Sequence, residues 1–141
     1  MGRVIRGKVI IKGRAEGEAL ASTEALSFWG GFDHRTGEII DRRHPLSGAI
    51  ATGRILILPF THGSSTTTAV LLEAVRARTA PAAILTSGAD SFFALASLVA
   101  DELYGRPIPL VALEPDDFTV LRTGDWIVLD EDGTVTSTNS E

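Results

Sequence analysis

A glycine followed by five consecutive hydroxyl side chains is the stretch of this sequence best suited to chemistry. The run begins at Gly63 and continues from Ser64 to Thr68. At the start of a helix, the first backbone N–H groups lack partners within the helix and carry the positive end of its dipole. Hydroxyls at that point can help to hold an anion, and a serine there can face a substrate. A well-capped helix start is the simpler alternative, because capping serines are common.

The residues around this run predict a strand, a turn and a helix. Four large aliphatic residues, Ile55–Leu58, are typical of a strand buried on both faces. Pro59 ends the strand because it has no N–H to donate, and Gly63 allows a sharp reversal. A broad apolar stripe then predicts a helix over about 66–78. The turn lacks the lysine of a P-loop, so a binding site for nucleotide phosphates is disfavoured. It also does not match a nucleophile elbow, which has a single serine between glycines.

The rest of the chain predicts short strands in the first half and alternating strands and helices in the middle. Asp90 is placed to cap a second helix that runs to about Leu103. Gly13 and Gly17 predict a loop in close backbone contact with another segment. Strands are expected at Val4–Ile11, Ala19–Ser22, Glu38–Asp41, Ala82–Leu85, Pro109–Leu113, Trp126–Leu129 and Thr134–Thr136. The pattern favours an α/β domain with a mixed sheet and a βαβα core.

The length of 141 residues fits one domain over residues 1–141, with residues 136–141 expected to be a frayed tail. A net charge of −5 argues against nucleic acid as a partner. Without cysteine, the chain can form no disulfide and no thiolate metal or cluster site of its own. We expect a cytoplasmic protein with no membrane partner, because no signal peptide or membrane-spanning run is visible.

Four further residues are candidates for contact with a ligand, each with a simpler alternative. Asp33 is either a turn residue or a polar group at the lip of a site, and Trp29 is either a packing anchor or a stacking surface. His44 can meet an anion or lie in a solvated basic loop. His62 precedes the turn and is a possible base or phosphoacceptor. No set of residues has metal-ligand spacing, so the chain shows no complete active site and can complete a site on another protein.

The sequence resembles the small subunit, or swivel domain, of the aconitase X group of hydro-lyases. The resemblance covers nearly the whole chain in the order found in that family. The motifs that carry it are Gly13-Arg-Ala-Glu-Gly-Glu-Ala, Leu26-Ser-Phe-Trp-Gly-Gly-Phe-Asp, Thr36-Gly-Glu-Ile-Ile-Asp, His44-Pro-Leu-Ser-Gly, Ile55-Leu-Ile-Leu-Pro, Gly63-Ser-Ser, Ala80-Pro-Ala-Ala-Ile and Glu102-Leu-Tyr-Gly.

The resemblance implies a swivelling β/β/α domain and a large catalytic subunit that carries an iron–sulfur cluster or iron. In aconitase-type chemistry a swivel-domain serine is the base, and that role falls on Ser64, with Ser65 as the alternative. The resemblance places substrate binding on residues around this serine and in the earlier loops: Gly63, Ser65, Thr66, Trp29, Asp33 and His44. Other aconitases follow the serine pair with arginine, whereas this chain continues with threonine, so substrate anchoring must come from elsewhere.

Related enzymes dehydrate either cis-3-hydroxy-L-proline or mevalonate 5-phosphate. The Glu102-Leu-Tyr-Gly ending favours the hydroxyproline type, so a small hydroxy acid is the expected substrate. Two other readings remain open from the residues. One is a stand-alone regulatory module that holds an anion. The other is a phosphohistidine domain that uses His62, for which a shared general fold is weak support.

Overall fold

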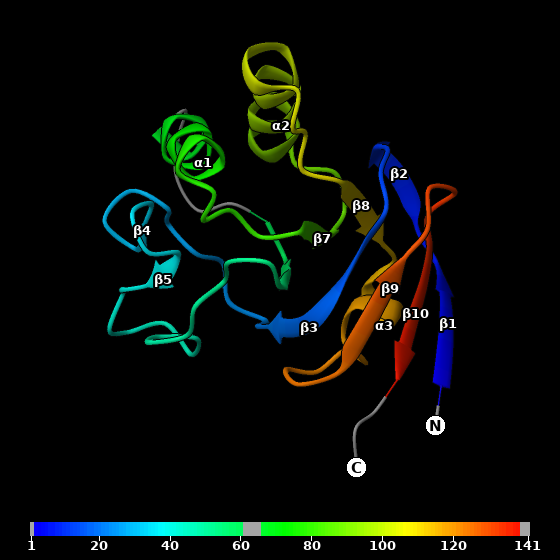
Figure 1. Ribbon diagram of the computed structural model, residues 1–141. Coiled ribbons are helices and arrows are strands. Elements are labelled where there is room, and N and C mark those ends of the chain that lie inside the picture. Colours follow the sequence, from blue (N-terminus) through cyan, green and yellow to red (C-terminus); the bar gives the residue numbers. More distant parts are fainter. Residues whose placement is uncertain (1, 61–65, 139–141) are drawn as a thin grey trace.

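The computed structural model describes residues 2–60 and 66–138, in which two layers of strands and one layer of helices are stacked (Figure 1). The strands of the large sheet are β1 (Gly2–Arg6), β2 (Lys8–Ile11), β3 (Ala15–Ala21), β6 (Ile55–Leu58), β7 (Ala83–Ser87), β8 (Leu110–Leu113), β9 (Trp126–Leu129) and β10 (Thr134–Thr138). A small hairpin joins β4 (Phe32–Asp33) to β5 (Glu38–Ile39), and the helices are α1 (Thr66–Ala77), α2 (Ser91–Tyr104) and α3 (Pro115–Phe118).

The large sheet folds back on itself. Its strand order is β1-β10-β9-β3-β6-β7-β8-β2, yet β1 and β2, at the two ends of that order, are separated only by Gly7. The chain therefore crosses from one strand layer to the other at this residue. The second crossing is β3, whose first four residues pair antiparallel with β9 and whose last three pair parallel with β6. The strands β3, β6, β7 and β8 are parallel neighbours.

Strand β6 shows why four consecutive aliphatic residues are needed. Successive side chains of a strand point to opposite faces. Leu56 and Leu58 belong to the core beneath α1 and α2, whereas Ile55 and Ile57 belong to the core between the two strand layers. All four are fully buried. The sheet is thus covered on both faces, as the sequence predicted.

Both ends of α2 are set by local chemistry. The Asp90 carboxylate accepts hydrogen bonds from the backbone N–H groups of Phe92 and Phe93, at 3.0 and 3.1 Å. At the other end Gly105 adopts a left-handed conformation with φ of 64°, and its N–H bonds to Asp101. This cap and this stop confirm the sequence prediction for the second helix.

The predicted fold class is confirmed, and so is the helix predicted from Thr66. The β6-α1-β7-α2-β8 unit is the expected βαβα core with one further strand. None of the helices in the described residues is long and apolar enough to cross a membrane.

Three sequence predictions need correction. Val4–Ile11 is two strands, because Gly7 lies against Gly133 and the chain changes layer there. The predicted loop around Gly17 is the first half of β3; its close contact is real, because a Cβ at Gly17 would lie 2.7 Å from the oxygen of Gly53. The tail expected to fray from residue 136 continues β10 to Thr138, paired with β1. Residues 139–141 lie outside the described residues.

Substitution of Gly7 by alanine should destabilise the protein by about 1–3 kcal/mol, because overpacking forces neighbours to move. A Cβ at this position would overlap Val111 Cγ1 and lie 3.2 Å from the carbonyl oxygen of Ala112. Urea unfolding measures the loss. Gly2→Ala is the matched control, because the atom nearest to its new Cβ is 3.9 Å away. Equal unfolding midpoints for the two variants would contradict this account of the crossing.

Candidate functional site

The carboxyl ends of the four parallel strands meet along one side of the sheet, which we name the carboxyl edge. Parallel sheets commonly bind ligands just outside this edge. Here the segments that leave the edge begin at Ser22 after β3, Pro59 after β6, Gly88 after β7 and Glu114 after β8. The hydroxyl-rich run follows β6, in the middle of this set. Strand β6, which leads into the predicted serine segment, thus ends at the edge where a ligand site is expected.

The segment with His62, Gly63, Ser64 and Ser65 lies outside the described residues, but both of its flanks are placed. Strand β6 ends at Leu58, and α1 begins at Thr66. Thr66 is exposed and Thr67 is buried. The Thr68 hydroxyl is shielded from solvent and has no hydrogen-bond partner among the described residues. The first turn of α1, which follows the predicted base directly in the sequence, therefore carries polar groups.

Among the described residues, two hollows lie at the carboxyl edge, and their linings include opposite ends of α3. The β3 hollow has a volume of about 270 Å³ and is lined by Ala21, Ser22, Thr23, Ile57, Phe118, Thr119, Leu121, Arg122 and Thr123. The β8 hollow has a volume of about 430 Å³ and is lined by Arg6, Gly7, Lys8, Ser87, Gly88, Ala89, Ala112, Leu113, Glu114 and Pro115. Each is large enough for part of a small ligand.

His44 lies in a buried position where both ring nitrogens have backbone partners. Its Nε2 is 3.0 Å from the carbonyl oxygen of Glu24, and its Nδ1 accepts from the N–H of Leu46 at 3.1 Å. Glu24 in turn bonds through its N–H to Ser22 Oγ, at the end of β3. His44 thus holds the segment that leaves β3 at the carboxyl edge. Direct contact with substrate stays a prediction.

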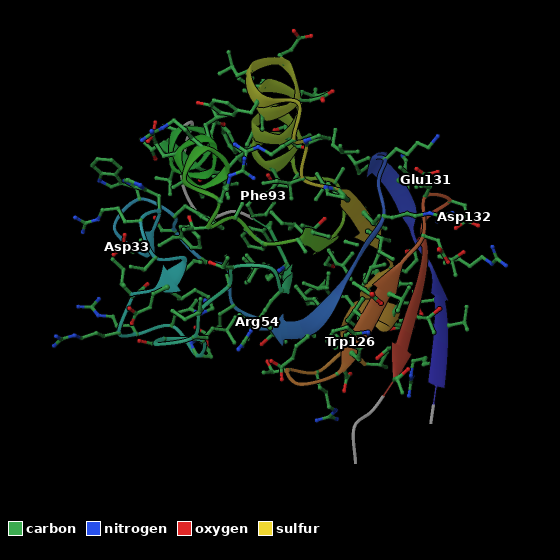
Figure 2. All side chains as sticks on the ribbon, in the orientation of Figure 1. Asp33, Arg54, Phe93, Trp126, Glu131 and Asp132 are labelled. Atoms are coloured by element: carbon green, nitrogen blue, oxygen red, sulfur yellow. The ribbon has the colours of Figure 1, made fainter. Side chains whose placement is uncertain are left out.

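Asp33 lies at the other end of α1, as its place in the β4–β5 hairpin indicates (Figure 2). The next carbonyl, of His34, accepts a hydrogen bond from Thr79, just after the helix ends. A helix of 12 residues is about 18 Å long, so the structure separates Asp33 from the start of α1. The N–H of Arg35 donates to the Asp33 carboxylate at 2.9 Å and, with the Arg35 side chain, lowers the pKa of this carboxyl. These contacts agree with the interpretation of Asp33 as a turn residue. A role of Asp33 in substrate binding stays a prediction.

Trp29 is 70% exposed, next to the buried Phe28. The Phe28 ring packs against Phe32 and against Phe93 in the first turn of α2, with ring centroids 5.3 and 5.6 Å away. Phe28 is therefore the packing anchor, and it places Trp29 on the surface. A substrate contact by Trp29 stays a prediction.

Sequence reasoning missed the contribution of the turn at 122–125. In the structure the Thr123 hydroxyl bonds to both the N–H and the carbonyl of Ala21, at 2.9 and 3.2 Å. This contact spans 102 residues of sequence, so no local signal could have revealed it.

Metal ligation is not a feature of the described residues, because none of their His, Asp and Glu side chains form a group of three that could hold an ion. The chain also contains no cysteine. The arrangement at the carboxyl edge instead supplies hydroxyls, backbone N–H groups and a few cations. Such groups can bind an anion and orient it.

Comparison with known proteins agrees with this picture. The aconitase X swivel domain family matches residues 4–137. The chain is 47% identical over 106 residues, 75% of its length, to cis-3-hydroxy-L-proline dehydratase of Pseudomonas aeruginosa, but spans only 18% of that enzyme. It is 37% identical over 110 residues to the phosphomevalonate dehydratase small subunit of Methanothermobacter thermautotrophicus, which covers 78% of this chain and 79% of that subunit.

A solved structure is similar over almost its whole length. The crystal structure of Thermococcus kodakaraensis aconitase X in its holo form superposes with a TM-score of 0.86 at 31% identity, covering 97% of this chain and 99% of that one. A match of this extent covers both strand layers and the helix layer. The chain belongs to the aconitase X swivel domain family.

Proposed function

We propose that this chain is the small subunit of an aconitase X-type hydro-lyase and completes an active site on a large subunit. One observation carries the proposal. The chain matches 79% of a separate small subunit over 110 residues, and 18% of a much longer dehydratase over 106 residues. A module found both as a subunit and within a longer enzyme is expected to work together with the remaining part. The carboxyl edge is the surface we assign to the shared site.

In this proposal Ser64 is the base that removes a proton from the carbon next to the one bearing the leaving hydroxyl. Loss of that proton and of the hydroxyl leaves a double bond and releases water. A serine hydroxyl is a weak base unless its developing charge is stabilised. The first turn of α1, which begins two residues further on, carries the positive end of the helix dipole and can supply this stabilisation. Gly63, Ser65 and Thr66 are assigned to the same turn, and Trp29, Asp33 and His44 are retained as candidates for substrate contact.

We assign the iron or iron–sulfur cluster expected for this chemistry to the large subunit. The present chain has no cysteine thiolate to hold a cluster. Its described residues also offer no group of three metal-ligating side chains. When bound, such a metal centre would supply Lewis-acid help to the departing hydroxyl. The part of this chain is to bind, orient and deprotonate the substrate.

We favour cis-3-hydroxy-L-proline as substrate, with mevalonate 5-phosphate as the alternative, and a cytoplasmic location. The relative named for hydroxyproline is 47% identical over the matched residues, against 37% for the phosphomevalonate subunit. Both compounds are small hydroxy acids with at least one anionic group. Assay of the assembled pair on each compound separates the two substrates.

Ser64→Ala should lower kcat of the assembled enzyme by roughly 10²–10⁴-fold, the usual contribution of general base catalysis. The small subunit should still co-purify with its partner, because the change removes one hydroxyl. Steady-state kinetics of the co-expressed pair measure the effect. Ser91→Ala is the matched control, since Ser91 is an exposed serine at the start of α2. Full activity of the Ser64 variant, with loss of activity on Ser65→Ala, would move the base to Ser65.

The isolated chain should be inactive on both compounds and gain activity only with the large subunit. This follows from the assignment of the metal centre to the partner. Mixing the separately purified chains and following product formation tests it. A lone chain that binds an anion, forms no complex and never turns over substrate would instead support a stand-alone regulatory module.

A further inference from the structure

The β3 hollow carries the features of an oxyanion site. Between Pro59 and Val75, the stretch that includes the predicted base, the sequence has no lysine or arginine. A cation for an anionic substrate group at this edge must therefore come from another segment or another chain. Among the residues that line the β3 hollow, Arg122 is the one with a charged side chain. Four hydroxyl residues also line this hollow: Ser22, Thr23, Thr119 and Thr123. The hydroxyls of Thr119 and Thr123 donate to the backbone carbonyls of Asp116 and Ala21, which leaves those of Ser22 and Thr23 as possible donors to an anion.

The turn that carries Arg122 is fixed to the carboxyl edge by a set of hydrogen bonds. The N–H of Arg122 donates to the carboxylate of buried Asp125 at 3.0 Å, and Ser137 Oγ lies 3.3 Å from the same oxygen. Two backbone bonds then tie the turn to Ala19 of β3, from Gly124 N–H to the Ala19 carbonyl and from Ala19 N–H to the Asp125 carbonyl. The backbone of Arg122 is thus held in place before any ligand arrives, which reduces the ordering cost of binding.

The guanidinium of Arg122 is available for a ligand. The ion pairs found among the described residues join Arg35 to Asp33, Arg54 to Glu18 and Arg76 to Glu73, and none includes Arg122. Arg122 is exposed to solvent. A planar guanidinium offers paired N–H donors that match the oxygens of a carboxylate or a phosphate.

The β8 hollow is less suitable for an anion although it is larger. Its cations are Arg6 and Lys8, but Glu114 also lines it. Hydrogen bonds from Thr134 are the main cause of the lowered pKa of the Asp132 carboxyl, and the positive charge of Arg6 adds to it, so part of the field of Arg6 is already compensated. The β3 hollow has no lining carboxylate.

We propose that the β3 hollow is an oxyanion subsite in which Arg122, with the hydroxyls of Ser22 and Thr23, holds a carboxylate or phosphate group of the substrate. This subsite adds a substrate-binding residue to the proposed function, and the identity of its ligand rests on that function. The hollow includes Ile57 of β6, the strand that leads into the predicted base segment. Arg122 would then bind the substrate at a point away from the atoms that react.

The first test is independent of catalysis and uses the full chain in solution. Inorganic phosphate and acetate are titrated separately, at constant ionic strength set with sodium chloride, while the amide signals are followed by NMR. We expect saturable shifts at Thr23, Thr119 and Thr123 and at the Arg122 side-chain N–H, with a dissociation constant on the order of millimolar. Comparing the two probes shows which oxyanion the hollow prefers.

Arg122→Gln should abolish these shifts, whereas Arg122→Lys should retain part of them because it keeps the charge but loses the paired donors. Arg14→Gln is the matched control. Arg14 is exposed, joins none of the ion pairs above and precedes the opposite end of β3. Absence of saturable shifts in the wild type, or equal shifts in the Arg122→Gln chain, would overturn the subsite.

In the assembled enzyme, Arg122→Gln should raise KM on the order of 10- to 100-fold with a smaller change in kcat, as expected from the loss of a charged hydrogen bond made before the reaction. Arg14→Gln should leave both constants unchanged. A wild-type pair without dehydratase activity would count against the proposed function and leave the result of the anion titration standing. An active pair in which Arg122→Gln leaves KM unchanged would overturn Arg122 as a substrate contact.

Discussion

The change of partner along β3 is the constraint on which the other parts of the structure depend. Its first four residues pair with β9 and its last three with β6, so this single strand belongs to both strand layers. Gly17 lies in the first half because the backbone at Gly53 comes too close for any side chain. The chain also crosses between the two strand layers at Gly7, which joins β1 to β2 at opposite ends of the strand order. Between the two crossings the layers enclose a core of aliphatic side chains.

This arrangement decides which segments meet at the carboxyl edge. Because β3 enters the parallel set beside β6, the segment after β3 leaves the carboxyl edge beside the end of β6. The chain returning from β8 through α3 must cross the same edge to reach β9, and it leaves Arg122 and Thr123 beside the end of β3. Residues about 100 apart in the sequence are thus neighbours. The edge is assembled by the topology and not by any local motif.

The sequence predicted what depends on local pattern. The β6 aliphatics, the Asp90 cap and the Gly105 stop each act through near neighbours, and each is observed. The strand around Gly17 was missed because its glycine serves a partner far along the chain, at Gly53. The Arg122 turn was not linked to the site, because its place there depends on a contact with Ala21 that only the fold supplies. The position of Asp33 at the far end of α1 also depends on a contact between distant residues, since the neighbouring His34 bonds to Thr79.

The groups that remain available at the carboxyl edge limit the chemistry that the described residues can perform. The Asp90 carboxylate caps α2, Asp125 holds the Arg122 turn, and both ring nitrogens of His44 have partners. Each is therefore occupied by the fold. Glu114 is exposed and makes no capping bond, but it follows β8, two strands from β6, or about 10 Å at ordinary strand spacing. In the proposed function, proton removal is therefore assigned to the segment between Phe60 and Thr66, whereas the described part of the edge around Arg122 is suited to holding an anion.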